Sequence, residues 1–152
     1  VVHLDCGFSP SQIYKEINNA LKKGLSVYDN RLDVAELENI QPDFSAIYKT
    51  PLGTACFATS AKSELKLEGK KLIGSAQRKI GSVILQHGSI LCGTYHKRII
   101  DYLNLDNQQK QLVLNDLEKK TIEIETVLNE KVDYSKLGSS LKEGFLSYFD
   151  KL

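Results

Sequence analysis

The chain has 152 residues, of which 41% are hydrophobic and 26% charged, a composition that suits one globular domain with a single sizeable core. Lysine and arginine number 20 against 19 acidic residues, so the net charge of +1 favours neither nucleic acid nor an anionic membrane surface as the main partner. No apolar run approaches the roughly 20 residues of a membrane-spanning helix. No secretory signal is recognisable either, so we expect a cytoplasmic location.

The N-terminal region predicts a strand, a helix and a second short strand. Val1 to Leu4 is typical of a strand. A capping box formed by Ser9 and Gln12 begins a helix whose apolar residues recur every four positions, and we expect Gly24 to end it. Residues 34–37 favour a short strand.

Between Ala55 and Leu91 the pattern predicts three consecutive strands. In the first, leucines alternate with charged residues from Ser63 to a turn at Glu68-Gly69. The second runs back from Lys70 to Gln77, and the third, Val83 to Leu91, follows another turn. Connections this short cannot hold a parallel crossover, so we expect an antiparallel meander.

The remainder of the chain is mostly helical in pattern. A short helix is expected after Thr94, and a second capping box at Asp106 and Gln109 begins another. Residues 121–128 fit either a short helix or a strand. Asp133 caps a last helix with apolar residues at every fourth position: Leu137, Leu141, Phe145 and Phe149.

Three cysteines at wide spacing, without a CxxC pair, argue against a disulfide framework and against a zinc site. Cys6, Cys56 and Cys92 are therefore first interpreted as small buried hydrophobes. Cys56 becomes a candidate nucleophile where a cation or base lies near enough to favour its thiolate, and Lys71 and His87 are the candidates for that role.

Other polar residues of the central stretch could also carry chemistry. Strand alternation lets only one lysine of the Lys70-Lys71 pair point into a pocket, where its ammonium could hold a carbonyl oxygen or a phosphate; an exposed hairpin end is the alternative. The small residues of Gly74-Ser75-Ala76 allow a ligand or another backbone to approach closely. His87 could be a general base or a hydrogen-bonded structural residue. No metalloprotease, serine hydrolase, P-loop or Rossmann motif is present.

Taken together, residues 56–91 resemble the lipoate-protein ligase and octanoyltransferase branch of the biotin/lipoate protein ligase superfamily. The matching elements are Cys56-Phe57 followed by Ser60 and Glu64, the hairpin Gly69, the Lys71-x-x-Gly74-Ser75-Ala76-Gln77 core, and Gln86-His87-Gly88-Ser89. A weaker resemblance extends to the helix after Ser9 and to the last helix.

The resemblance implies a mixed α/β (α+β) fold in which helices flank a largely antiparallel central sheet, as in class II aminoacyl-tRNA synthetase-like biotin and lipoate ligases. Lys71 would bind the acyl carbonyl or acyl-adenylate, and Cys56 would become an acyl-enzyme. Gly74 and Ser75 would let the acyl chain lie close to the sheet. The other substrate-binding residues implied are Ala76, Gln77, His87, Gly88 and Ser89.

The implied function is an acyltransferase of lipoate metabolism that moves an octanoyl or lipoyl group to a lysine of a lipoyl domain or of glycine cleavage H protein. Acyl carrier protein would be the donor, and no cofactor would be needed. One alternative is a lipoate-protein ligase that uses ATP and Mg and in which Cys56 is merely packed. Another is a non-catalytic subunit or fragment that binds lipoyl domains. Biotin transfer is disfavoured, because the motifs are more similar to those of the lipoate branch.

The sequence departs from the family's pattern in its first third. Family members carry an Arg-Arg pair, a glycine-rich loop and a His-Asp pair upstream of the elements above, and nothing from Val1 to Gly53 matches them. We therefore expect residues 1–152 to be a single domain that forms the C-terminal portion of a catalytic domain. The glycine-rich half of the site would belong to a longer protein or to a second polypeptide.

Overall fold

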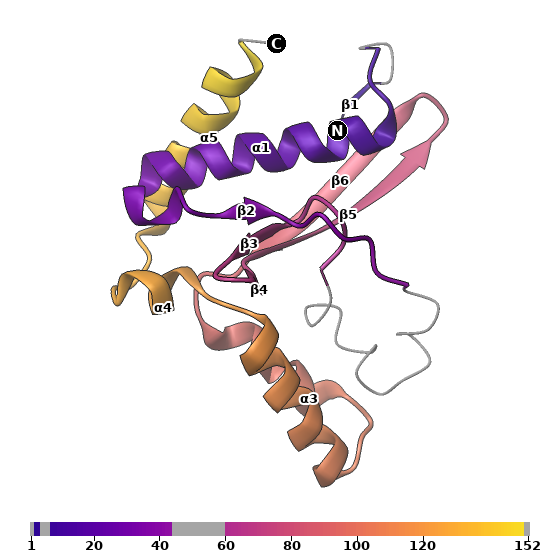
Figure 1. Ribbon diagram of the computed structural model, residues 1–152, viewed down its shortest axis with the longest axis vertical. Coiled ribbons are helices and arrows are strands. Elements are labelled where there is room, and N and C mark those ends of the chain that lie inside the picture. Colours follow the sequence, from indigo (N-terminus) through magenta and orange to yellow (C-terminus); the bar gives the residue numbers. More distant parts are fainter. Residues whose placement is uncertain (1, 4–6, 44–59, 151–152) are drawn as a thin grey trace.

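The protein is a mixed α/β structure in which helices flank two small antiparallel sheets (Figure 1). The computed structural model describes residues 2–3, 7–43 and 60–150. The predicted fold class is thereby confirmed. Within these ranges, no helix combines the length and apolar character needed to cross a lipid bilayer.

The elements follow one another along the chain as a strand, a helix, a strand-rich centre and a helical C-terminal part. Their bounds are β1 Val2–His3, α1 Pro10–Tyr28, the 3₁₀ helix η2 Asn30–Leu32, β2 Glu36–Leu37, β3 Leu65–Leu67, β4 Lys70–Lys71, β5 Ile73–Ile80, β6 Val83–Ile90, the 3₁₀ helix η5 Thr94–Tyr102, α3 Asn107–Lys120, α4 Ile124–Leu128 and α5 Tyr134–Phe149.

In the part of the chain that the structure describes, the strands form two three-stranded sheets with the orders β1-β6-β5 and β2-β3-β4. The prediction of one continuous strand from Lys70 to Gln77 is wrong, because the chain bends at Leu72 and passes from one sheet to the other. The Leu72 amide donates to Leu65 O (2.9 Å), and Leu72 O accepts from the Leu91 amide (3.0 Å). This fully buried residue therefore joins the two sheets.

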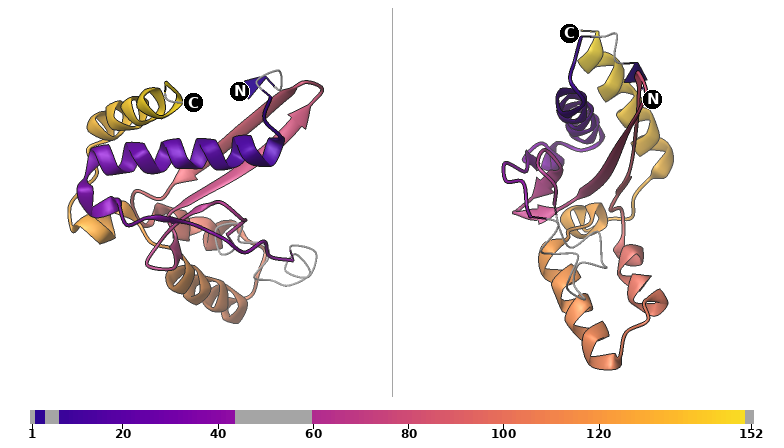
Figure 2. Two further views of the ribbon diagram at one scale, coloured as in Figure 1. Left: turned by 45° about the horizontal axis from the view of Figure 1, so that its top comes forward. Right: turned by 90° about the vertical axis from the view of Figure 1, so that its right-hand side faces the viewer.

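Among the described residues, two hydrophobic clusters stabilise the fold. The larger one gathers residues of α1, both sheets, α4 and α5, and its fully buried members include Leu25, Leu65, Leu72 and Ile124. The smaller one lies between η5 and α3, which run side by side at one end of the molecule (Figure 2). The capping boxes predicted at the starts of α1 and α3 are both present.

Helix α5 crosses α1 at a pair of glycines (Figure 1). A Cβ atom added to Gly144 would lie 2.3 Å from the backbone N of Gly24. The expectation that Gly24 ends the first helix is wrong, because α1 continues to Tyr28. Gly24 instead leaves room for the close approach of the second helix.

We predict that Gly144→Ala destabilises the protein by about 1–3 kcal/mol, because the added methyl group overpacks the helix crossing. Gly138→Ala in the same helix is the matched control, since no atom lies within 4 Å of its added Cβ. It should stabilise by about 0.5–1 kcal/mol through helix propensity. Urea unfolding followed by circular dichroism measures both, and equal effects of the two substitutions would contradict the proposed role of the crossing.

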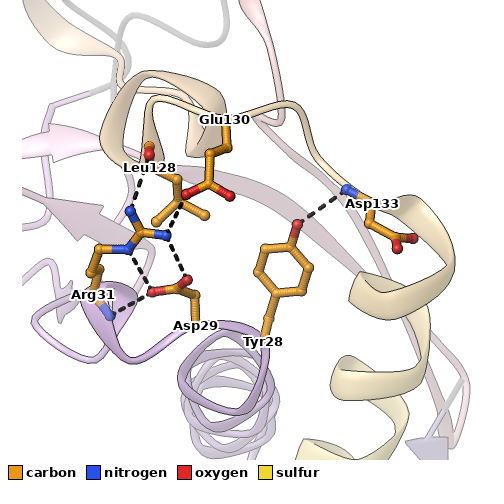
Figure 3. Close-up of polar contacts among 6 residues, drawn as sticks. All are labelled: Tyr28, Asp29, Arg31, Leu128, Glu130 and Asp133. Atoms are coloured by element: carbon orange, nitrogen blue, oxygen red, sulfur yellow. Dashed lines mark hydrogen bonds and ion pairs between the residues drawn. The ribbon is translucent and has the colours of Figure 1, made fainter.

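Hydrogen bonds tie η2 to α4 and the end of α1 to the start of α5 (Figure 3). The Arg31 guanidinium donates to both carboxylate oxygens of Asp29 and also to Leu128 O and Glu130. The Tyr28 hydroxyl accepts from the Asp133 amide at 3.1 Å. Hydrogen bonds from the Arg31 side chain and backbone lower the pKa of Asp29 from its usual 3.8 to about 2.

Because the folded state lowers this pKa, Asp29 contributes stability above about pH 4 that is lost as the pH falls towards 2. We predict that Asp29→Asn is less stable than the wild type at pH 7 by about 0.5–1 kcal/mol, a small value because water screens the exposed Arg31. The difference should shrink between pH 4 and pH 2 in urea titrations. With exposed Asp33→Asn as the control, a deficit that stays constant with pH would contradict the role of this charge.

Candidate active site

Lys71 lies at the end of a short hairpin and points into the protein. The turn between β3 and β4 uses Glu68 and Gly69, both with positive φ (53° and 73°). The Lys71 side chain is only 5% exposed, whereas Lys70 is half-buried. The Lys71 ammonium lies 2.9 Å from Glu64 Oε2. The structure thus turns one lysine of the pair inward, as alternation predicts.

Glu64 is the centre of a buried polar network. Its side chain is 3% exposed. Besides the Lys71 ammonium, Oε2 accepts from the Ala61 amide (2.7 Å), and Oε1 accepts from the Ser75 amide (2.8 Å). The Tyr14 hydroxyl lies 3.3 Å from Oε1. A carboxylate has about four lone-pair positions, so this one is fully satisfied.

Tyr14 reaches the network from helix α1. Its hydroxyl also lies 3.1 Å from Ser75 O, and both neighbouring oxygens are acceptors, so the phenol must keep its proton. Burial and the negative charge of Glu64 raise the pKa of Tyr14. The side chain is therefore a neutral donor at physiological pH.

A pocket of about 740 Å³ adjoins this network. Tyr14 and Ser75 form part of its wall, and Gln77 lies beyond them on β5. Its remaining lining comes from the first turn of α1 and from the segments before β3, and includes Gln12, Lys15, Gln41, Lys62 and Ser63. The pocket is therefore open to solvent and carries amide and ammonium groups at its rim.

The two motifs of the central stretch pair directly across β5 and β6. The register places Gly74 opposite Ser89, Ser75 opposite Gly88, and Ala76 opposite His87. A Cβ atom on Gly88 would lie 2.4 Å from Gly74 O. The small residues predicted a close approach by a ligand or by another backbone, and here the backbone of β5 is what approaches Gly88.

The same register divides the predicted site residues between two faces. Successive residues of a strand point to opposite sides. Ser75 and Gln77 line the pocket beside α1, so Ala76 and its cross-strand partner His87 lie on the other face, where both are exposed. Ser89 is also exposed. The roles of these residues in binding substrate stay predictions.

A second buried polar cluster was not predicted from the sequence. The Thr121 hydroxyl donates to Leu117 O (2.7 Å) and so accepts from His96 Nε2 at 2.9 Å. Burial lowers the pKa of His96. Burial would raise the pKa of Glu123, but hydrogen bonds from Thr126 and Lys97 outweigh it and lower that pKa.

This cluster is joined to Lys71 through the backbone. Thr121 and Lys71 form an isolated parallel bridge, and the Ile122 amide donates to Lys71 O at 3.0 Å. Residues 121–128 thus combine a bridge with helix α4, which resolves the ambiguity of their pattern. The bridge holds the backbone of Lys71 from the side opposite β3.

Of the three cysteines, Cys92 lies within the described residues. Cys6 and Cys56 lie outside the described residues, so the predicted nucleophile is not placed. Cys92 is half-buried and packs against the main core, as expected for a small hydrophobe. Burial and then the charge of Glu125 raise its pKa, which disfavours the thiolate. Among the described residues, no group of three or more His, Cys, Asp or Glu side chains is arranged to hold a metal ion.

Sequence reasoning gave no role to Tyr14 or Glu64. Tyr14 lies next to the apolar positions of the helix and resembles an ordinary packing residue. Glu64 alternates with Leu65 in a pattern that predicts a solvated acidic side chain. Two signals pointed to Glu64: it is one of the elements that match the family, and an inward-pointing Lys71 would need a buried partner.

The antiparallel sheets, the flanking helices and the buried lysine–glutamate pair next to a pocket make up a mixed α/β domain. A sequence model of the lipoyl protein ligase A/B catalytic domain matches residues 2–146, and the chain belongs to this family. No solved structure matches significantly.

Several relatives carry the name octanoyltransferase LipM. The chain is similar to that of Lysinibacillus sphaericus (strain C3-41), with 27% identity over 140 residues, or 90% of this chain and 49% of the relative. It is 29% identical to that of Clostridioides difficile (strain 630) over 90% of this chain and 49% of the relative. For Bacillus subtilis (strain 168) the identity is 32% over 64% of this chain and 35% of the relative. The chain thus spans about half the length of these relatives or less.

We predict that Gly88→Ala disrupts the pairing of β5 with β6, because its methyl group would collide with Gly74 O. Amide hydrogen exchange of residues 73–90 should accelerate, and the protein should lose about 1–3 kcal/mol of stability. The neighbouring exposed residue gives the control, since His87→Ala should change stability by less than about 0.5 kcal/mol. Unchanged exchange in Gly88→Ala would show that the paired strands accommodate the methyl group and would contradict the prediction.

Proposed function

We propose that this chain contributes the acyl-transfer residues of an octanoyltransferase, which moves an octanoyl group through Cys56 to a lysine of a lipoyl domain. The observation that carries the proposal is the buried ammonium of Lys71, held by Glu64 beside a pocket. Membership of the lipoyl ligase family and the names of the similar proteins support it.

The first step forms a thioester on the protein. Cys56 Sγ attacks the carbonyl carbon of an octanoyl thioester, the bond to the donor sulfur breaks, and the proton of Cys56 passes to the departing thiolate. The Lys71 ammonium is suited to hold the carbonyl oxygen as it gains negative charge. The proposed donor is acyl carrier protein.

The second step transfers the acyl group to the acceptor. The neutral amine of the acceptor lysine attacks the thioester carbon, a C–N bond forms, and the C–S bond to Cys56 breaks. The amine proton returns to the Cys56 thiolate. A thiol intermediate divides one transfer into two easier ones, and neither step consumes a nucleotide. The acceptor is a lipoyl domain or glycine cleavage H protein.

We predict that incubation with octanoyl carrier protein adds one octanoyl group to Cys56, observed by intact-mass spectrometry and peptide mapping. Cys56→Ala should abolish the adduct, because it removes the thiol that attacks the octanoyl carbonyl. Cys92→Ala is the matched control and should retain the adduct, since Cys92 is packed against the core with a raised pKa.

Two results would overturn the proposal. One is an adduct that survives Cys56→Ala. The other is ATP-dependent lipoylation of an acceptor domain that Cys56→Ala leaves unimpaired, which would identify the protein as a ligase.

A further inference from the structure

We propose that Glu64 is a positioning residue of the transfer reaction, which fixes the Lys71 ammonium, and that Tyr14 connects this pair to the wall of the pocket. The inference rests on the function proposed above. Glu64 and Tyr14 do not bind the acyl group themselves but act through Lys71, which does.

The geometry of the Glu64 carboxylate supports this role. Its oxygens accept from two backbone amides, those of Ala61 (2.7 Å) and Ser75 (2.8 Å), which lie on opposite sides of it in the sequence. A carboxylate held by two backbone groups cannot rotate without losing a hydrogen bond. The third contact, to Lys71 Nζ at 2.9 Å, therefore has a fixed direction.

A lysine needs such a fixed partner to act on a reacting carbonyl. Its four-carbon side chain is flexible, and its ammonium carries three donors that rotate freely. Electrostatic stabilisation of a transition state depends on donors that are already aimed before the reaction. With 5% exposure, Lys71 has little water to compete for the ammonium.

A second lysine–glutamate pair in the same sheet provides a comparison. Lys66 lies directly across from Lys71 in the β3–β4 pair, and its ammonium lies 2.8 Å from Glu38. The Lys66 side chain is 26% exposed and the Glu38 side chain 15%, against 5% and 3% for Lys71 and Glu64. The two pairs have nearly equal lengths, so they differ mainly in burial and in their position relative to the pocket.

Tyr14 supplies the connection to the pocket. Its ring lines the pocket, and its hydroxyl lies within hydrogen-bonding distance of Glu64 and of Ser75 O. A molecule that fills the pocket therefore contacts a side chain bonded directly to the partner of Lys71. Tyr14 thus brings helix α1 into this network.

The test is a double-mutant cycle on the rate of octanoylation of Cys56 by octanoyl carrier protein. We expect Glu64→Gln, which keeps the shape but removes the charge, to lower the rate about 100-fold, as misplacement of a reacting group does. In a Lys71→Met background the same substitution should have no further effect, because residues that act as a unit are not additive. Glu38→Gln is the matched control and should leave the rate unchanged.

Tyr14→Phe is the milder variant in case Glu64→Gln fails to fold, as judged by circular dichroism. Loss of one hydrogen bond to Glu64 should lower the rate about fivefold, again only when Lys71 is present. A loss of equal size with and without Lys71, in either variant, would show a general structural role and overturn the inference. So would a wild-type rate in folded Glu64→Gln.

A second measurement separates this inference from the proposed function. Failure of the wild type to be acylated would sink the proposed function alone, and the side-chain ¹⁵N resonance of the Lys71 ammonium then decides whether Glu64 positions it. We expect a resonance protected from exchange in the wild type and in Glu38→Gln but lost in Glu64→Gln. Equal resonances in all three proteins would overturn the positioning role.

Discussion

The burial of one ion pair constrains much of this structure. Removing an ammonium and a carboxylate from water costs several kcal/mol for each ion, and their mutual attraction offsets this only when further hydrogen bonds satisfy the remaining atoms. Here the compensation comes from the backbone amides of Ala61 and Ser75 and from the Tyr14 hydroxyl. Three separate segments of the chain must therefore come together before the Lys71–Glu64 pair can be buried.

The joint between the two sheets brings two of those segments together, β3 with the residues before it and β5. Leu72 bonds to Leu65 in one sheet and to Leu91 at the end of the other. The residue before it, Lys71, is the last of β4 in the first sheet, and Ser75 lies four residues after Lys71 in β5 of the second sheet. In a single continuous strand the Lys71 ammonium and the Ser75 amide would lie far apart, because the chain advances along the strand with every residue and side chains point out of the sheet. Because the chain bends at Leu72, the Glu64 carboxylate can accept from both the Lys71 ammonium and the Ser75 amide.

The sequence predicted the helices well because their signals are local. The capping boxes, the four-residue spacing of apolar residues and the cap at Asp133 each depend on a few neighbouring positions. The exception is Gly24, whose partner Gly144 lies 120 residues away, so no local pattern could distinguish a helix end from a helix crossing. The sheet was predicted only in part for the same reason, since the bend at Leu72 depends on hydrogen bonds to two distant segments.

The candidate site was likewise predicted only in part from the sequence. The resemblance to a family gathered Lys71, the Gly74 to Gln77 run and the His87 to Ser89 run, and the register of β5 and β6 does bring the two runs together. What the motif could not convey is which side each residue takes. The alternation of Glu64 with Leu65 predicts a solvated carboxylate, because a local pattern does not show whether a helix covers the polar side of a strand. In the structure Tyr14 of α1 lies over that side and contacts Glu64.

The register also limits how a substrate can use the predicted residues. Ser75 and Gln77 line the pocket beside α1, whereas Ala76 and His87 are exposed on the opposite face of the same hairpin. A ligand in the pocket therefore reaches the first pair and is separated from the second by the sheet itself. Residues that appear as one motif thus belong to two surfaces of the hairpin. The Lys71–Glu64 pair lies on the pocket side of this division, because the Ser75 amide that holds Glu64 and the Tyr14 hydroxyl at the pocket wall meet on the same carboxylate oxygen.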